Sequence, residues 1–323
     1  MTNRRFSLLA ALALVAVPLA VQAQGYPAKP VKLLVPLAAG STADILSRTI
    51  GTELARELGQ AVVVENKAGA GGTIAMAELA RSDPDGYIIA FASQGTLVFN
   101  QALYAKPGYD SLKDFAPIVL VGGVSNVMIV PPNSTAKTAM DVVAAARAKP
   151  GMTFSSGGSG TSHHLSGVLF GQLTGTQLTH VPYRGAPQGI LAVMSGEVDM
   201  GFYNTPTVIA QIRENKVKGL AVTSLTRSDL LPQLPTLDAS GVRAYEVNTW
   251  FGFVAPAGTP PEVVAKLHAA IGRILVLPAV REKLAAQGFE LAPLQSPAHF
   301  ASVIRDDLAK WPAIIKASGA KVD

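Results

Sequence analysis

Short apolar runs alternate with amphipathic stretches along this chain, and that order limits the fold more than any other feature of the sequence. Apolar runs at residues 31–36, 61–65 and 87–92 predict strands, and apolar residues recur at helical spacing over residues 45–58. The same order of strand, loop and helix continues through residues 127–254. This alternation predicts an α/β fold in which parallel strands are covered by helices on both faces.

The composition excludes several classes of protein. Hydrophobic residues make up 49% of the 323 residues and charged residues only 15%, so the chain can bury a core and is not intrinsically disordered. The absence of cysteine excludes a disulfide scaffold, thiolate metal sites and thiol catalysis. The formal net charge of +5 is not clustered, and we therefore expect no nucleic-acid partner.

Residues 1–23 have the pattern of a cleaved secretory signal peptide. Arg4 and Arg5 precede an apolar run at residues 6–21, and small residues stand at the −3 and −1 positions of a cleavage site after Ala23. The alternative is a membrane anchor, but an apolar run of about 16 residues is shorter than the roughly 20 that span a bilayer. No later stretch is long and apolar enough to cross a membrane. We expect export to a bacterial periplasm, which also suits a chain without cysteine.

The strand and helix pattern divides into two α/β units. We place the crossings between them near residues 121–126 and 245–250, so that the C-terminal helices return to the first unit. The predicted first domain therefore comprises residues 24–122 and 248–323, and the second domain comprises residues 123–247.

Several loops are placed where α/β proteins bind ligands, which is beyond the carboxyl ends of the strands. These loops share glycines, hydroxyl residues and a following helix whose free N–H groups can receive a carboxylate. The loops contain Gly40, Ser41, Thr42 and Asp44; KAGAGGT at residues 67–73; SQGT at residues 93–96; SSGGSGTS at residues 155–162, followed by His163 and His164; Arg184 and Gly185; and Asn204. Arg184 could add a planar fork of donors for a carboxylate.

The same residues also allow structural roles that involve no ligand. Asp44 falls in the first turn of a helix, where it can serve as a cap or a dipole partner. Arg184 can instead pair with an acid across the cleft. One of the two histidines can be packed or solvated, and Asn204 can cap the next helix.

No catalytic or metal-binding motif emerges from these loops. Residues 67–73 match neither a P-loop nor the GxGxxG pattern, and residues 157–161 do not form a nucleophile elbow. The adjacent His163 and His164 cannot share one helix face, so they are a poor metal pair. The sites are rich in donors and poor in acids, which favours a receptor for a small carboxylate, with no cofactor or metal, over an enzyme.

Taken together, these motifs resemble the Bug (TctC-like) family of solute receptors, which serve tripartite tricarboxylate transporters. The signal peptide and YPAKP at residues 26–30 are similar to the start of that family. The further motifs are VPLAAGSTAD at 35–44, ENKAGAGGT at 65–73, DPDGY at 83–87, YDSLKDFAP at 109–117, VPYRG at 181–185, GEVD at 196–199 and WFGFVAPAGTP at 250–260. They follow in order across the whole mature chain.

The resemblance implies a two-lobed periplasmic binding protein (type II-like), in which each lobe is a mixed, mostly parallel sheet flanked by helices. The lobes would close on a small carboxylate as a Venus flytrap, and a tripartite tricarboxylate-type membrane transporter would be the partner. One-to-one capture favours a monomer. The ligand-binding roles implied for this sequence fall on Ala39, Gly40, Ser41, Asp44, Ala70, Gly71, Gly72 and Thr73 in one lobe, and on Ser156, Gly158, Thr161, Arg184, Gly185 and Asn204 in the other. The loop analysis adds Ser93, Gln94 and His164.

The chain departs from the family pattern in two places. The first loop reads LAAGST at residues 37–42 where the family often shows a pair of glycines. The position of Asn204 is often aspartate in family receptors for amino-bearing ligands, and an asparagine has no charge to pair with an ammonium group. We therefore favour a plain carboxylate over an amino acid. The alternatives are a ligand-sensing input to a sensor kinase and an exported α/β enzyme.

Overall fold

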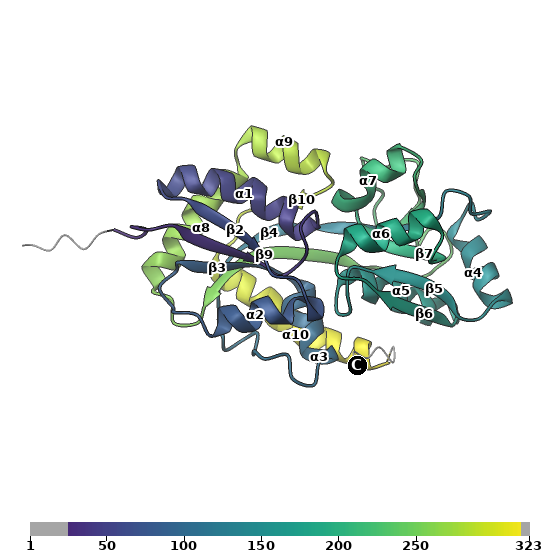
Figure 1. Ribbon diagram of the computed structural model, residues 1–323, viewed down its shortest axis with the longest axis horizontal. Helices are drawn as coiled ribbons and strands as arrows, with labels where there is room; N and C mark the ends of the chain where they lie inside the picture. The colour runs from purple at the N-terminus through teal and green to yellow at the C-terminus, as the bar shows by residue number, and fades with distance from the viewer. Residues whose placement is uncertain (1–24, 318–323) are drawn as a thin grey trace, which may run out of the picture.

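The computed structural model describes residues 25–317 of the protein (Figure 1). The predicted signal peptide lies outside the described residues. The first part of the chain forms β1 (Val31–Val35), α1 (Thr42–Leu58), β2 (Val62–Asn66), a 3₁₀ turn η1 (Ala70–Gly72), α2 (Thr73–Ala80), β3 (Ile88–Ser93), the π-helical turn η2 (Gly95–Phe99) and α3 (Asn100–Leu103). The sequence patterns gave no sign of η2 and α3.

The rest of the described chain continues the alternation of strands and helices. It forms β4 (Phe115–Val130), α4 (Ala139–Ala148), β5 (Met152–Ser156), α5 (Ser162–Thr174), β6 (Leu178–Pro182), α6 (Ala186–Ser195), β7 (Met200–Asn204), α7 (Thr205–Arg213), β8 (Lys218–Val222), β9 (Asn248–Pro256), α8 (Pro261–Leu275), α9 (Pro278–Ala286), β10 (Glu290–Leu291) and α10 (Pro297–Ala317). Within this part, no single helix is both long and apolar enough to span a bilayer, and only the bent pair α8 and α9 passes such a test by composition.

The strands form one mixed sheet in which eight follow the order β2-β1-β3-β9-β4-β7-β5-β6, while β8 and β10 each pair with β4. The predicted parallel pairs are present at its two ends, where β1 pairs with β2 and β3, and β5 pairs with β6 and β7. In the middle, β9 and β4 run antiparallel to their neighbours. The fold class predicted from the alternation and the family resemblance is therefore confirmed, with the antiparallel pairs concentrated around two central strands.

β4 begins at Phe115, well before residue 127, where the second series of strands and helices was expected to start. It pairs with β9 from Phe115 to Ser125 and with β7 from Asn126 onward, so one strand runs through both halves of the sheet. The Gly122-Gly123 pair hides this continuity in the sequence. A Cβ atom on Gly122 would lie 2.1 Å from the carbonyl oxygen of Glu290, so glycine is needed where β10 joins this edge.

The hydrophobic core alternates between the two faces of the sheet, as the period of a strand requires. Leu33 packs with α1, α8 and α9 on one face, whereas its neighbour Leu34 packs with α2 and α10 on the other. Figure 1 shows these two groups of helices on opposite sides of the strands. In the other half, Met128 and Ile129 likewise belong to different core clusters. Within each half, the parallel strands end at the same edge of the sheet, so the loops that follow them lie side by side.

Candidate functional site

A cavity of about 330 Å³ lies where loops from the two halves of the molecule face each other. One wall comes from the loop after β1, from η1 and from the chain after α3, and the other comes from the loops after β5 and β6. The lining residues are Leu37, Gly69, Ala70, Gly71, Gly72, Tyr104, Gly157, Gly158, Ser159, Pro182, Tyr183 and Arg184. The cavity is therefore built from segments far apart in the sequence.

A smaller inner pocket of about 20 Å³ shares Leu37 and Gly71 with this cavity. Its volume is close to the smallest that admits a water molecule, so a larger group requires the two walls to separate. The pocket is lined mainly by hydroxyl, imidazole and amide groups. The lining residues that it adds are Ser93, Gly95, Thr96, Gly160, Thr161, Ser162, His163, Asn204, Thr249 and Phe251.

Glycines allow the two walls to approach at backbone distance. A Cβ atom on Gly95 would lie 2.9 Å from the carbonyl oxygen of Gly160. A Cβ atom on Gly185 would lie 2.6 Å from Cβ of Ala38. These distances are shorter than van der Waals contact, so side chains at these positions would force the walls apart.

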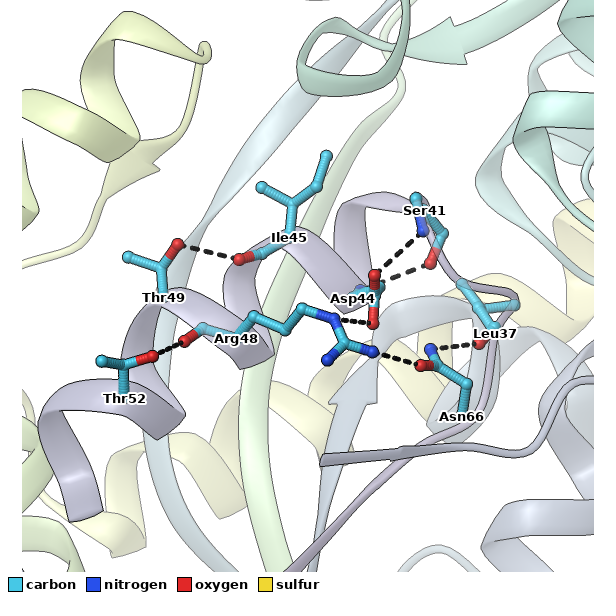
Figure 2. Close-up of polar contacts among 9 residues, drawn as sticks. Leu37, Ser41, Asp44, Ile45, Arg48, Thr49, Thr52 and Asn66 are labelled. Atoms are coloured by element: carbon cyan, nitrogen blue, oxygen red, sulfur yellow. Dashed lines mark hydrogen bonds and ion pairs between the residues drawn. The ribbon is translucent and has the colours of Figure 1, made fainter. Parts of the chain in front are cut away.

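The first loop is held by a network at the start of α1, which Figure 2 shows. Ser41 caps the helix and its Oγ accepts a hydrogen bond from the Asp44 amide at 3.3 Å. Asp44 Oδ2 accepts from the Gly40 amide at 2.9 Å, and Asp44 Oδ1 lies 2.9 Å from Nε of Arg48. Burial by itself raises the pKa of Asp44, but the hydrogen bonds from Arg48 and Gly40 outweigh it and hold that pKa below its ordinary value. Asp44 is thus an ionised structural group.

The same network reaches the wall of the cavity. Arg48 donates to Oδ1 of Asn66 at 2.9 Å, and Nδ2 of Asn66 donates to the carbonyl oxygen of Leu37 at 3.0 Å (Figure 2). Leu37 lines both the cavity and the inner pocket. An ion pair on α1 therefore fixes a loop that shapes the site. No motif in the sequence pointed to the part played by Asn66.

The serine- and glycine-rich loop at residues 155–162 uses several of its N–H donors in hydrogen bonds within the loop and to the start of α5. The Gly157 amide donates to Nδ1 of His163 at 3.3 Å, and the Gly160 amide donates to Nδ1 of His164 at 3.3 Å. The Gly158 amide donates to Oγ of Ser156 at 3.1 Å. The two consecutive histidines at the start of α5 thus organise the loop that precedes them. Fewer of its N–H groups remain for a ligand than the sequence led us to expect.

Two buried histidines, His163 and His164, and the half-buried His180 lie beside this loop and are neutral at pH 7. Burial lowers the pKa of His163 and of His164 to about 4. Burial and the nearby His164 lower the pKa of His180 to about 3, and the rings of His164 and His180 stack with centroids 4.0 Å apart. Among the described residues, no group of three or more His, Cys, Asp or Glu side chains is arranged to hold a metal ion.

Arg184 is the charged side chain in the lining of the larger cavity. It is exposed, and its backbone amide donates to Oε1 of Gln188. Within residues 25–317, its guanidinium has no ion pair, so the alternative of an acid across the cleft is not realised. The donors of this guanidinium are available to an anion in the cavity.

The structure brings together about half of the predicted site residues. Those that line the cavity or the inner pocket are Ala70, Gly71, Gly72, Ser93, Gly158, Thr161, Arg184 and Asn204. Those that do not line either space are Ala39, Gly40, Ser41, Asp44, Thr73, Gln94, Ser156, His164 and Gly185. Several of the second group support the walls instead of forming their surface.

Gln94 and His164 turn away from the cavity for identifiable reasons. Gln94 donates from Nε2 to Oδ2 of Asp307 at 2.8 Å, and Trp250 donates to the same oxygen at 2.6 Å, so Gln94 is directed toward α10. His164 stacks on His180, while its neighbour His163 lines the inner pocket. Consecutive residues on a helix point about 100° apart, so only one of the pair can face the pocket.

Sequence reasoning also missed lining residues that carry no local motif. Tyr104 follows the unpredicted α3, and Thr249 and Phe251 belong to β9. The hydroxyl of Thr249 is buried and has no hydrogen-bond partner among the described residues. The strand pattern alone gave no means to find these residues, because β9 reaches the site by pairing between β3 and β4.

The chain is similar to one protein family and to several proteins of known structure. The sequence model of the family described as the tripartite tricarboxylate transporter family receptor matches residues 46–320. The periplasmic binding protein BugD is 33% identical with a TM-score of 0.88, and the match covers 92% of this chain and 99% of BugD. A protein of R. palustris solved with adipate is 31% identical with a TM-score of 0.88, over 92% and 100% of the two chains. MatC from Rhodopseudomonas palustris with bound malate is 28% identical with a TM-score of 0.85, over 90% and 100%.

Proposed function

Because the chain belongs to the tripartite tricarboxylate transporter receptor family, we propose that it captures a small carboxylate in its cavity and delivers it unchanged to a transporter of that type. The family comprises solute receptors, which confirms the prediction of a binding protein instead of an enzyme. A cleaved signal peptide at residues 1–23 would take the protein to the periplasm, where BugD acts as a binding protein. N-terminal sequencing of the exported protein tests this, with Gln24 expected as the first residue.

The guanidinium of Arg184, which has no ion pair within residues 25–317, is the observation that carries the proposal. Arg184 lines a cavity of about 330 Å³, and the residues of that lining include no Asp or Glu. A planar guanidinium matches a carboxylate in a bidentate pair, and the glycine-rich wall allows close backbone contact. Two similar receptors were solved with adipate and with malate, which are both dicarboxylates. We therefore take a small dicarboxylate as the first candidate ligand.

The ligand would bind between two lobes that move about the central strands. We assign residues 24–122 and 248–323 to one lobe and residues 123–247 to the other. The partner change of β4 supports a division in this region, since β4 leaves β9 for β7 between Ser125 and Asn126, three residues beyond the boundary assigned here. A ligand that touches both walls has a higher affinity for the closed form, and this difference drives closure.

A thermal-shift and calorimetric panel tests the proposed ligand class. The panel contains adipate, malate, a monocarboxylate of similar size and the uncharged diamide of adipic acid. A ligand at 100 times its dissociation constant stabilises the protein by about 2.7 kcal/mol, which a thermal shift detects. We expect stabilisation by a carboxylate and none by the diamide, with the compound recovered intact afterwards. Stabilisation by no carboxylate, or recovery of an altered compound, would contradict the proposal.

Uptake measurements separate transport from sensing. A strain that lacks the protein should lose uptake of the bound carboxylate through its transporter. Altered transcription with normal uptake would instead support the alternative, in which the closed receptor signals to a sensor kinase.

A further inference from the structure

One side-chain hydrogen bond joins the two walls of the inner pocket. Oγ1 of Thr42, the first residue of α1, donates to Oδ1 of Asn204, the last residue of β7, at 3.1 Å. Both side chains are buried, and 162 positions separate them in the sequence. Away from β4 and β9, no other side-chain hydrogen bond or ion pair within residues 25–317 links one proposed lobe to the other.

The amide of Asn204 is fully occupied by the protein. Its Oδ1 also accepts from Nε2 of His163 at 3.1 Å, and its Nδ2 donates to Oδ1 of Asn126 and to Oγ of Ser162. An asparagine amide has two donors and two acceptor positions, and all four are used here. Asn204 therefore has no hydrogen-bonding group left for a ligand.

Backbone groups at both ends fix the direction of this chain of hydrogen bonds. The Gly157 N–H donates to Nδ1 of His163, so the neutral imidazole carries its proton on Nε2 and must donate to Asn204. At the other end, Nδ2 of Asn126 donates to the carbonyl oxygen of Ser162 at 3.3 Å, which leaves its Oδ1 for Asn204. If the side-chain amide of Asn204 were rotated by 180°, its NH₂ group would face the Nε2–H of His163, and both groups are donors. Its Oδ1 is thus held toward Thr42.

We propose that Thr42 and Asn204 form a latch that holds the lobes closed over the ligand, and that His163 orients the acceptor of this latch. Asn204 is then a positioning residue and not a ligand group. The inference rests on the proposed capture of a carboxylate between the lobes. The bond forms only when the walls meet, so its loss should mainly accelerate ligand release.

Paired substitutions in α1 test the latch. Thr42→Val removes the hydroxyl at nearly constant shape, whereas Thr42→Ser retains it. Thr49→Val is the matched control, because the buried Thr49 hydroxyl donates to the carbonyl oxygen of Ile45 within the same helix. With adipate and malate as probes, stopped-flow measurements should show about three- to tenfold faster dissociation for Thr42→Val. Its association rate, and both rates of the other two variants, should stay close to those of the wild type.

A ligand-free measurement keeps the latch testable if neither probe binds. The chain has no cysteine, so spin labels can be placed at Val63→Cys and Leu191→Cys, two exposed positions in different proposed lobes. Thr42→Val should shift the distance distribution toward longer, open separations, and Thr49→Val should not. Failure of wild-type binding would overturn the proposed function. Unchanged dissociation rates and unchanged distances in Thr42→Val would overturn the latch.

Discussion

The carbonyl oxygen of Ser159 lies so close to Gly71 that a Cβ atom on Gly71 would stand 2.2 Å from it. Gly71 also has a φ of +62°, in the left-handed region that favours glycine. Two walls of the cavity, separated by almost ninety positions in the chain, therefore meet through a glycine. Replacement of this glycine should affect both the local backbone and the approach of the walls.

Gly71→Ala should weaken carboxylate binding at least tenfold, because the methyl group keeps the walls apart. Gly59→Ala is a matched control, since Gly59 has a φ of +65° and no atom within 4 Å of an added Cβ. Both variants should lose about 1–2 kcal/mol of stability from backbone strain. Calorimetric titration and chemical denaturation of both proteins measure the two effects. Equal affinities in the two variants would show that the close approach of Gly71 to Ser159 is not needed for binding.

Arg184→Gln should lower the affinity for a carboxylate by about 1.5–3 kcal/mol, which is typical of a hydrogen bond to a charged group. Arg213→Gln is the control, because it removes the same charge from an exposed position on α7 that lines neither the cavity nor the pocket. Isothermal titration with malate or adipate at two salt concentrations distinguishes contact from general electrostatics. If both variants lose affinity equally, the role of Arg184 is only that of net charge.

Asp44→Ala should reduce the free energy of unfolding by about 1–2 kcal/mol, because it removes an acceptor at the start of α1 and the partner of Arg48. We expect a smaller change in the affinity of the folded protein for its ligand, since Asp44 lines neither space. Urea denaturation and titration of the same samples make the comparison. A lost affinity with unchanged stability would instead assign Asp44 to the ligand.

The protein should lose stability as the pH falls from about 6.5 to about 4. In this range the histidines of the unfolded chain bind protons, whereas the buried His163 and His164 do not, because burial lowers their pKa to about 4. The unfolded state therefore binds more protons, and each such histidine costs at most about 1.4 kcal/mol per pH unit. Above pH 6.5 this contribution is constant.

Replacement of one histidine isolates this effect from that of the carboxylates. The pKa of His180 is about 3, and its Nε2 forms a 2.7 Å hydrogen bond with Oγ of Ser156 that a glutamine amide can replace. His180→Gln should therefore show a shallower fall of melting temperature between pH 6.5 and 4 than the wild type. Parallel profiles for the two proteins would show that His180 does not contribute.

Features that depend on residues close together in the chain could be predicted from the sequence. The structural interpretation of Asp44, which the sequence left open beside a role in ligand binding, depends on positions within a few residues of each other. The parallel strands at the two ends of the sheet follow from the alternation of apolar runs and helices. Each of these features is fixed by neighbours along the chain, so a single sequence contains the information.

The surfaces of the cavity depended on contacts that no local pattern contains. The rotation of α5 against the sheet determined that His163, and not His164, faces the inner pocket. The pairing of β9 beside β4 brought Thr249 to the same space. The sequence by itself determined the alternating architecture and the glycine-rich, acid-poor loops, because backbone freedom and apolar periodicity are local properties. Only the tertiary structure decided which side chains meet across the pocket, such as Thr42 and Asn204, because packing between distant segments sets their direction.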